Sequence, residues 1–218
     1  MIRALVFDFD GLIVDTETPL IDAYADVHAT HGQPFNRAEF LRGVGHVDFT
    51  FNPWRAFGPD ADEAALETQR QQHNRTRTLA QPLLPGVVAL LDAARVAHLR
   101  LAVASNSSHD HVEGHLKRLG LHTMFEFFAC RGDAPSPKPE PDLYRLVLQK
   151  FGLRGHEAIA FEDSHTGSLA AKRANLWTVA VPNASTAHHD FPHVDLCVSS
   201  LAELTLPDLL ARFGAQKN

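Results

Sequence analysis

Two aspartates separated by one residue, Asp8 and Asp10, are the first side chains in the sequence that could do chemistry. Side chains of an extended chain alternate between two faces, so both carboxylates point to the same side. At about 4 Å the two charges repel by roughly 4 kcal/mol at an effective dielectric constant of about 20. Such a pair needs a cation, a shared proton or open solvent, and Asp-x-Asp followed by Gly11 also suits a solvated turn. The motif by itself therefore leaves a reactive site and a plain turn equally open.

Further polar residues follow apolar runs later in the chain. Ser105 and Asn106 come directly after one such run, and Glu162 and Asp163 end another. Lys138 stands between prolines in the segment that leads into the helix before that second run. A cluster of carboxylate oxygens suits a hard cation such as magnesium, and a lysine beside a hydroxyl suits a tetrahedral oxyanion such as phosphate. The sequence contains no glycine-rich P-loop motif, so a phosphate would be held without one.

These side chains can converge only if the apolar runs are strands of one parallel sheet. The runs are short and mostly apolar, which is typical of strands buried on both faces. Predicted helices separate the runs, and this alternation indicates an α/β fold with a doubly wound parallel sheet. The carboxyl ends of such strands share one edge, where open α/β sheets bind ligands. The expected strands span 2–7, 99–104, 125–130, 158–161, 177–181 and, as a sixth candidate, 194–198.

Residues 16–80 break this alternation, because they contain predicted helices and no convincing strand. These helices are expected at 19–31, at 36–42 and from Asp60 or Asp62 to about 80, with a broken helical piece at 49–57. We therefore predict two domains: a core made of residues 1–15 and 81–218, and an inserted helical cap made of residues 16–80. Within the core, the helix before the fifth strand is expected at 169–174.

Composition argues against several other classes of protein. The 218 residues carry a formal net charge of −6 and no long basic run, which argues against nucleic acid as a partner. We recognise no signal peptide and no apolar run long enough to span a bilayer, so we expect no membrane partner. Cys130 and Cys197 form no Cys-x-x-Cys motif and are expected to be buried free thiols. The expectation is a monomeric protein of the reducing cytoplasm.

Taken together, the polar motifs resemble those of the haloacid dehalogenase superfamily. They follow one another in that family's order, the resemblance covers essentially the whole chain, and the helical insert resembles the family's small α-helical cap. The resemblance implies a Rossmann-like core that carries out phosphoryl transfer. The motifs are Asp8-Phe9-Asp10-Gly11 with Asp15-Thr16-Glu17, Ser105-Asn106-Ser107, Lys138-Pro139-Glu140-Pro141 and Phe161-Glu162-Asp163-Ser164.

The resemblance implies catalytic roles for four residues. Asp8 would be the nucleophile that takes the phosphoryl group as an aspartyl-phosphate. Asp10 would protonate the leaving oxygen and then activate water. Ser105 and Lys138 would hold the phosphoryl oxygens. The dehalogenases of the superfamily lack the second aspartate, so Asp10 favours phosphate chemistry over cleavage of a carbon–halogen bond.

The resemblance also implies a bound Mg²⁺ cofactor. Its ligands would be the Asp8 carboxylate, the Asp10 backbone carbonyl and Asp163. Glu162 lies next to Asp163 in the sequence, and it could be a neighbour of the metal or simply an acidic residue of the loop.

Within the superfamily the chain most resembles the β-phosphoglucomutase-like and sugar-phosphatase branch, in which a loop of the cap contacts the substrate. That loop would be residues 41–46, so Arg42, Gly43 and His46 are candidate substrate-binding residues. Thr16 and Asn106 are two further candidates, although either could instead cap a helix.

The chain departs from the mutases of this branch at three positions. They carry an arginine where this chain has His46, a histidine at Leu20 and a lysine at Ser108. A mutase must rebind a bisphosphate intermediate and keep water away from Asp8, so the loss of a phosphate-binding group favours hydrolysis. The leading hypothesis is therefore a magnesium-dependent phosphatase acting on a small phosphorylated metabolite such as a sugar phosphate. The alternatives are a phosphomutase and a non-catalytic binding protein on the same fold, and the intact set of catalytic residues argues against the last.

Overall fold

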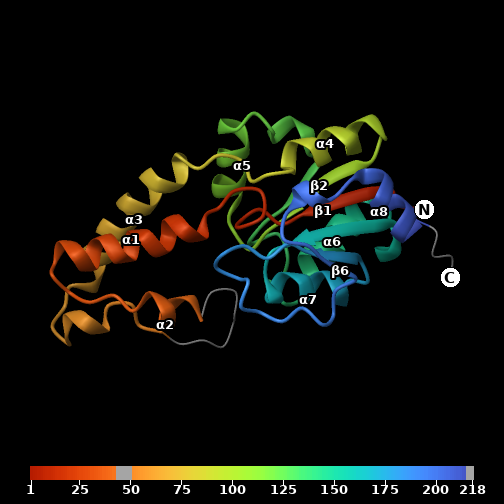
Figure 1. Cartoon of the computed structure of the whole chain (residues 1–218). Helices are drawn as coiled ribbons and strands as arrows, with labels where there is room; N and C mark the ends of the chain where they lie inside the picture. Colours follow the sequence, from red (N-terminus) through yellow and green to blue (C-terminus); the bar gives the residue numbers. More distant parts are fainter. Residues whose placement is uncertain (43–50, 215–218) are drawn as a thin grey trace.

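The computed structural model describes residues 1–42 and 51–214, and these residues contain a six-stranded sheet (Figure 1). The strand order is β3-β2-β1-β4-β5-β6, and every neighbouring pair is parallel. This sheet confirms the predicted α/β fold. The strands are β1 (Ala4–Phe7), β2 (Arg100–Ala104), β3 (Phe127–Ala129), β4 (Ala158–Glu162), β5 (Trp177–Ala180) and β6 (Leu196–Cys197).

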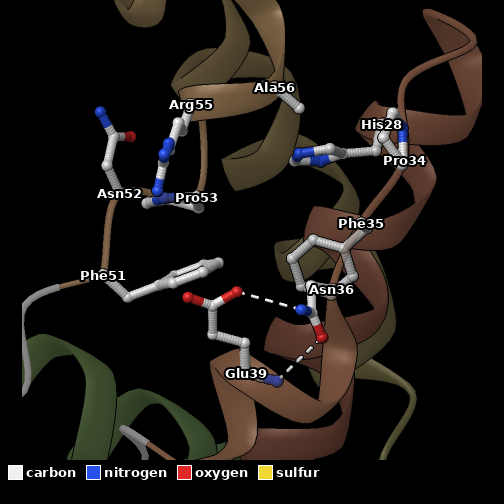
Figure 2. Close-up of a pocket in the computed structure, with 10 residues that line it drawn as sticks. All are labelled: His28, Pro34, Phe35, Asn36, Glu39, Phe51, Asn52, Pro53, Arg55 and Ala56. Atoms are coloured by element: carbon white, nitrogen blue, oxygen red, sulfur yellow. Dashed lines mark hydrogen bonds between the residues drawn. The ribbon is translucent and has the colours of Figure 1, made fainter.

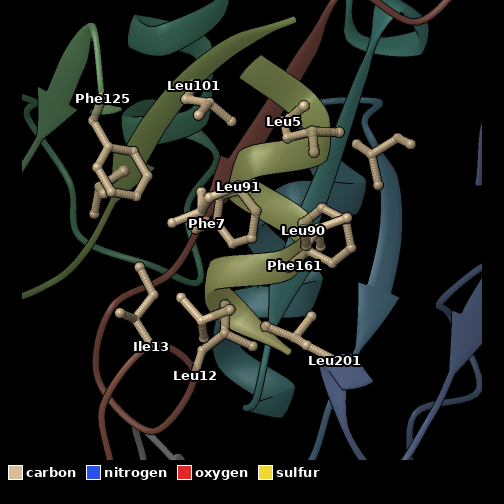
Figure 3. Close-up of a cluster of buried hydrophobic side chains, with 14 of the residues drawn as sticks. Leu5, Phe7, Leu12, Ile13, Leu90, Leu91, Leu101, Phe125, Phe161 and Leu201 are labelled. Carbon is tan, nitrogen blue, oxygen red and sulfur yellow. The ribbon is translucent and has the colours of Figure 1, made fainter. Parts of the chain in front are cut away.

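The first strand, β1, lies inside the sheet between β2 and β4, and all of its residues are buried. Alternate side chains of a strand face opposite sides of the sheet. Leu5 and Phe7 belong to the apolar cluster on one face, whereas Ala4 and Val6 belong to the cluster on the other. Phe7 stacks on Phe161 of β4 with ring centroids 4.8 Å apart (Figure 3). β1 is apolar throughout because both of its faces are covered.

Helices cover both faces of the sheet. On one face, α4 (Val87–Val96), α5 (His109–Arg118) and α8 (Leu206–Gly214) contribute apolar residues to the cluster that contains Phe7. On the other face, α6 (Asp142–Phe151) and α7 (His165–Arg173) contribute to the opposite cluster. This arrangement leaves the carboxyl edge of the sheet for the polar residues that follow the strands.

Some details differ from the expectation. α7 begins at His165 rather than at 169, because Ser164 caps it by accepting a hydrogen bond from the Gly167 backbone N–H at 3.1 Å. The α8 helix has no counterpart among the expected elements. Cys130 is a buried free thiol as expected, but Cys197 is exposed because it lies on the short edge strand β6. No helix within the described residues is both long and apolar enough to cross a membrane.

The described residues between 16 and 80 form helices and no strand: α1 (Glu17–Thr30), α2 (Arg37–Leu41), the 3-10 helix η1 (Arg55–Phe57) and α3 (Glu63–Leu79). α1 and α3 lie side by side and extend away from the sheet (Figure 1). This segment has an apolar cluster of its own, built on Val27, Trp54 and Leu66. Arg77 Nη2 of α3 also binds Asp26 Oδ2 of α1 at 2.7 Å. A segment with its own core can act as a unit, although the predicted domain boundaries stay a prediction.

A cavity of about 390 Å³ opens within this helical segment (Figure 2). On its wall, the Asn36 carboxamide accepts a hydrogen bond from the Glu39 backbone N–H and donates one to the Glu39 carboxylate. All of its lining residues come from positions 28–56. This cavity is therefore separate from the sheet edge at which the predicted catalytic residues lie.

Candidate active site

A second cavity, of about 570 Å³, opens at the carboxyl ends of the central strands. Phe7 of β1 is in register with Val103 of β2 and Phe161 of β4, so the residues that follow these strands meet at one edge. The cavity brings together most of the predicted site residues. Those that line it are Asp8, Asp10, Thr16, Ser105, Asn106, Lys138 and Asp163.

Four predicted residues are not part of the described wall of this cavity. Glu162 is fully buried behind it, where it contacts Lys138. Arg42 is exposed at the end of α2 and does not line the cavity. Gly43 and His46 lie outside the described residues.

Lys138 is held between two buried carboxylates. Its Nζ donates to Asp8 Oδ1 at 2.7 Å, to Glu162 Oε1 at 2.5 Å and to the Ala104 carbonyl at 2.7 Å. These three bonds use all three hydrogens of the ammonium group. Burial disfavours the charged form, but the Asp8 and Glu162 carboxylates outweigh burial and raise the pKa of Lys138. Lys138 is therefore a fixed positive charge on the cavity floor.

Two further residues fix this arrangement. Asn106 Oδ1 accepts from the Lys138 backbone N–H at 2.9 Å, and Asn106 Nδ2 donates to the Lys138 carbonyl at 3.2 Å. Asn106 does not cap α5, because Ser108 is the N-cap of that helix. Tyr144 of α6 donates its hydroxyl to Glu162. Tyr144 was not among the predicted site residues, since nothing in its spacing distinguishes it from the apolar residues of the same helix face.

The carboxylates of Asp8, Glu162 and Asp163 form a buried acidic cluster, in which one oxygen atom of each residue lies within 4.8 Å of one oxygen atom of each of the others. Burial raises the pKa of Asp8 to about 8, although Lys138 opposes this rise. Burial, together with Asp8 and Glu162, raises the pKa of Asp163 well above its usual value. Glu162 Oε2 is buried without a hydrogen-bond partner in the described part of the chain. Three carboxylates facing one ammonium group leave excess buried negative charge, so this donor set fits a hard cation such as Mg²⁺.

Asn183 orients Asp163, and no local pattern in the sequence pointed to it. Its Nδ2 donates to Asp163 Oδ2 at 2.8 Å and to the Gly11 carbonyl at 3.0 Å. Gly11 has a φ of +74°, and a Cβ atom on it would lie 2.4 Å from Asp163 Oδ2. The turn after Asp10 therefore requires glycine both for its conformation and for its space.

Asp10 shares the cavity with Asp8 but has a different environment. Its Oδ1 lies 2.8 Å from His111 Nε2, and its Oδ2 accepts from the Ser107 hydroxyl at 2.6 Å. Burial alone would raise the pKa of Asp10, but His111 and the hydroxyls of Ser107 and Thr16 outweigh burial and hold this pKa below its usual value. Asp8 and Asp10 thus have pKa values displaced in opposite directions, which is typical of two carboxylates with different roles.

The partners of Asp10 were only partly foreseen. Thr16 is buried in the cavity wall, and its side chain does not cap α1, so the capping alternative is wrong. His111 and Ser107 were not among the predicted site residues. The available signal was their place in the sequence, because both lie in or just before the first turn of the helix that follows β2.

Comparison with known proteins places the chain in a family. A family model described as haloacid dehalogenase-like hydrolase matches residues 2–175. YhcW of Bacillus subtilis (strain 168) is 36% identical over 220 residues, which cover 99% of this chain and 100% of YhcW. Hexitol phosphatase B of Escherichia coli (strain K12) is 34% identical over 217 residues, which cover 96% of this chain and 97% of that protein.

The fold also has a solved counterpart. The crystal structure of CbbY from Rhodobacter sphaeroides in complex with phosphate matches with a TM-score of 0.72 and 28% identity, and the match covers 94% of this chain and 96% of CbbY. The family model spans most of the chain, and all of the residues that line the acidic end of the cavity, from Asp8 to Asp163, lie within it. The chain belongs to the haloacid dehalogenase-like hydrolases.

Proposed function

We propose that this hydrolase is a magnesium-dependent phosphatase that removes phosphate from a small phosphorylated sugar or sugar alcohol. The observation that carries the proposal is the pairing of two carboxylates in one cavity: Asp8, held by Lys138 beside the acidic cluster, and Asp10. The relatives support this chemistry, because one is named a hexitol phosphatase and another was crystallised with phosphate.

The acidic cluster would hold the Mg²⁺. Its ligands would be the carboxylates of Asp8 and Asp163 and the backbone carbonyl of Asp10. Glu162 has its Oε1 committed to Lys138 and Tyr144, so we give it the role of fixing Lys138 rather than that of a metal ligand. When bound, the cation would neutralise the phosphoryl oxygens and reduce their repulsion by Asp8.

In the first half-reaction, Asp8 attacks the phosphorus atom through Oδ2, the oxygen that does not bind Lys138. The bond between phosphorus and the substrate oxygen breaks, and Asp10 gives a proton to that oxygen. Asp10 acquires this proton when the substrate phosphate enters, because a nearby negative charge raises a carboxyl pKa. Ser105 offers its hydroxyl to the phosphoryl oxygens, and Lys138, whose three hydrogens are already bonded, contributes its positive charge.

In the second half-reaction, Asp10 acts as a base. It takes a proton from a water molecule, whose oxygen attacks the phosphorus atom of the aspartyl-phosphate. The bond between phosphorus and Asp8 breaks, inorganic phosphate forms and Asp8 is again a carboxylate. Asp10 ends this step protonated and releases its proton when inorganic phosphate leaves, because the negative charge that had raised its pKa is gone. Both aspartates are then back in their starting states.

The cavity favours hydrolysis over a mutase reaction. Leu20 adds an apolar side chain to the wall, and the Ser108 hydroxyl accepts a hydrogen bond from the His111 backbone N–H as the cap of α5. Neither residue offers the positive charge that would hold a second phosphate group at these positions. We therefore keep the phosphatase as the proposal.

Residues 16–80 would act as a cap over this cavity. Thr16 lines the cavity already, and we propose that Arg42, Gly43 and His46 contact the substrate when the cap closes. We further propose that the protein works as a monomer in the cytoplasm. Size-exclusion chromatography with light scattering measures the first of these two properties.

A metabolite panel tests the function. Purified protein is incubated with phosphorylated sugars, sugar alcohols and unrelated phosphate esters, and released phosphate is measured with Mg²⁺ and with a chelator. We expect Mg²⁺-dependent release that favours the sugar-type esters, and Asp8→Asn should abolish it. The exposed Asp92→Asn is the matched control and should keep full activity. Full activity in chelator, or isomerised substrate without phosphate release, would contradict the proposal.

A further inference from the structure

Asp10 is held by donors from the segment that begins α5. His111 Nε2 lies 2.8 Å from Asp10 Oδ1, and Ser107 donates to Oδ2 at 2.6 Å. An ionised carboxylate only accepts hydrogen bonds, so the imidazole donates from Nε2–H, which a neutral ring provides in one of its tautomers. Each oxygen of Asp10 thus has its own donor, and the plane of the carboxylate is fixed.

The His111 ring is itself held in place. The backbone N–H of His111 donates to the hydroxyl oxygen of the N-cap residue Ser108, and this bond fixes the first turn of α5. The ring packs edge-on against the buried Phe9, with centroids 5.6 Å apart and an interplanar angle of 88°. On another side it lies 4.9 Å from the ring of His115. These two ring contacts and the bond to Asp10 restrict the orientation of the imidazole, of which a third stays exposed.

We infer that His111 is a positioning residue, which fixes the Asp10 carboxylate in the orientation that its proton transfers require. The inference rests on the proposed function, in which Asp10 serves first as an acid and then as a base. Both steps need its carboxylate within hydrogen-bond reach of the reacting oxygen. A side chain that is already oriented before the substrate arrives avoids the entropic cost of orienting it during the reaction. His111 acts through Asp10 and not on the reacting atoms.

Two substitutions separate the hydrogen bond of His111 from its packing. His111→Phe keeps a ring against Phe9 but removes the donor, whereas His111→Gln loses the ring and retains an amide N–H of similar reach. We expect His111→Phe to lower kcat for a sugar phosphate by about 10- to 100-fold, as partners that orient a reacting group typically do. KM should change by less than about threefold, because the lost interaction acts mainly in the transition state. His111→Gln should recover most of kcat.

The leaving group identifies the step that is affected. A sugar alkoxide needs a proton to depart, whereas nitrophenolate needs it much less. In rapid-quench experiments, His111→Phe should slow phosphoenzyme formation more for the sugar phosphate than for nitrophenyl phosphate. Hydrolysis of the phosphoenzyme should slow equally with both substrates, because the intermediate is the same. The control is His109→Gln in the same helical turn, whose native side chain faces Glu113 and Asp133, and it should match the wild type.

The outcomes are distinguishable. Equal loss of phosphoenzyme formation with both substrates, or no recovery in His111→Gln, would give His111 a packing role and overturn the inference. Thermal unfolding establishes that His111→Phe is folded, and if it is not, His111→Asn, whose amide is too short to reach Asp10, takes its place. If the wild type releases phosphate and His111→Phe has the same kinetics as the wild type, only the positioning role is overturned. A wild type that releases no phosphate in Mg²⁺ overturns the proposed function.

Discussion

Asp8 and Asp10 follow β1 and are separated by one residue, yet their neighbours shift the pKa values of the two carboxylates in opposite directions. Burial raises the pKa of Asp8 to about 8, whereas His111 and Ser107 hold the pKa of Asp10 below its usual value. The difference comes from the residues that face each carboxylate and not from the residue type. At the residue scale, the pKa of each carboxylate in the site thus depends on the side chains that it contacts.

Tyr144 illustrates the cost of removing one such contact. Among the described residues, its hydroxyl and the Lys138 ammonium group are the hydrogen-bond partners of the Glu162 side chain, and Tyr144 and Glu162 are both fully buried. We expect Tyr144→Phe to lower the free energy of unfolding by about 1.5–3 kcal/mol, the usual range for a hydrogen bond to a charged group. Urea denaturation measures this change. Tyr24→Phe is the matched control, since no hydrogen bond of the Tyr24 hydroxyl is found in the described chain, and an equal loss in both variants would contradict the prediction.

The acidic cluster permits a comparison of two neighbouring acids. Asp163 faces the cavity, whereas Glu162 is turned toward Lys138. We expect Asp163→Asn to weaken Mg²⁺ binding by at least about tenfold more than Glu162→Gln does, because removing a ligand charge affects the metal directly. Isothermal titration calorimetry with Mg²⁺ measures both affinities. Equal affinities in the two variants would mean that Asp163 is not a metal ligand.

At the scale of elements, α5 contacts the core and Asp10 on one side and an ion-pair cluster on the other. The inner face contributes Val112 and Leu116 to the core, and its first turn presents His111 to Asp10. On the outer face, Glu113 accepts from His122 Nε2 and His109 Nδ1, each at 2.8 Å. The bond from His122 ties α5 to the 3-10 helix η2 (His122–Met124), which precedes β3.

The Glu113 cluster predicts a defined dependence of stability on pH. The hydrogen bonds from His122 and His109 lower the pKa of Glu113 from 4.5 to about 2. The contribution of Glu113 to the free energy of unfolding is therefore fully present above pH 4.5 and is lost as pH falls toward 2. Burial opposes the charged form of His109, but Glu113 and Asp133 outweigh burial and raise the pKa of His109 above 6.5. The contribution of His109 to the free energy of unfolding is therefore fully present below pH 6.5 and is lost as pH rises through the elevated pKa of His109.

The matching variant is Glu113→Gln. It should be less stable than the wild type by about 0.5–1 kcal/mol, as expected for a partly exposed ion pair, and the difference should be largest between the two limits at 4.5 and 6.5. Urea unfolding across a pH series measures it. The exposed pair on α4 provides the control, because Asp92→Asn should show no such maximum. A difference that does not vary with pH would contradict the linkage.

At the scale of the whole molecule, the helical segment and the sheet are joined at one place. Val14, just before the segment, and Leu83, just after it, pair in an isolated antiparallel bridge. The two connections therefore run side by side, and two adjacent connections favour a hinge. The helices α1 and α3 extend from this point away from the sheet (Figure 1).

We predict that the segment closes over the cavity when a phosphate mimic binds. Small-angle scattering with Mg²⁺ and aluminium fluoride should give a smaller radius of gyration than the protein alone. Arg42→Ala should raise KM by about tenfold, because closure would bring its guanidinium to the substrate. Arg55→Ala, in the wall of the separate cavity of this segment, is the control and should not change KM. An unchanged shape together with unaltered kinetics of Arg42→Ala would contradict closure.

The main features of the fold could be predicted because their causes are local. An apolar run that ends in polar residues marks a strand and its functional end, as for β1 with Asp8 and β4 with Asp163. The start of α7 was placed too late, because the weakly apolar stretch 165–168 gave no helical period and the cap of Ser164 was not recognised. The α8 helix was missed although its buried residues Leu206, Leu209 and Phe213 recur at helical spacing, so the signal for it was present in the sequence.

The sequence by itself determined the parallel sheet, the shared strand edge and most of the polar residues that line the cavity there, since each follows from hydrophobic period, turn residues and motif order. The tertiary structure alone decided which partner each reactive residue has. His111 meets Asp10 across 101 positions, Tyr144 meets Glu162 across 18, and Asn183 meets Asp163 across 20. The physical reason is that pKa values and side-chain orientation depend on distances of a few ångströms between elements, which the packing of helices on the sheet sets and no local pattern records.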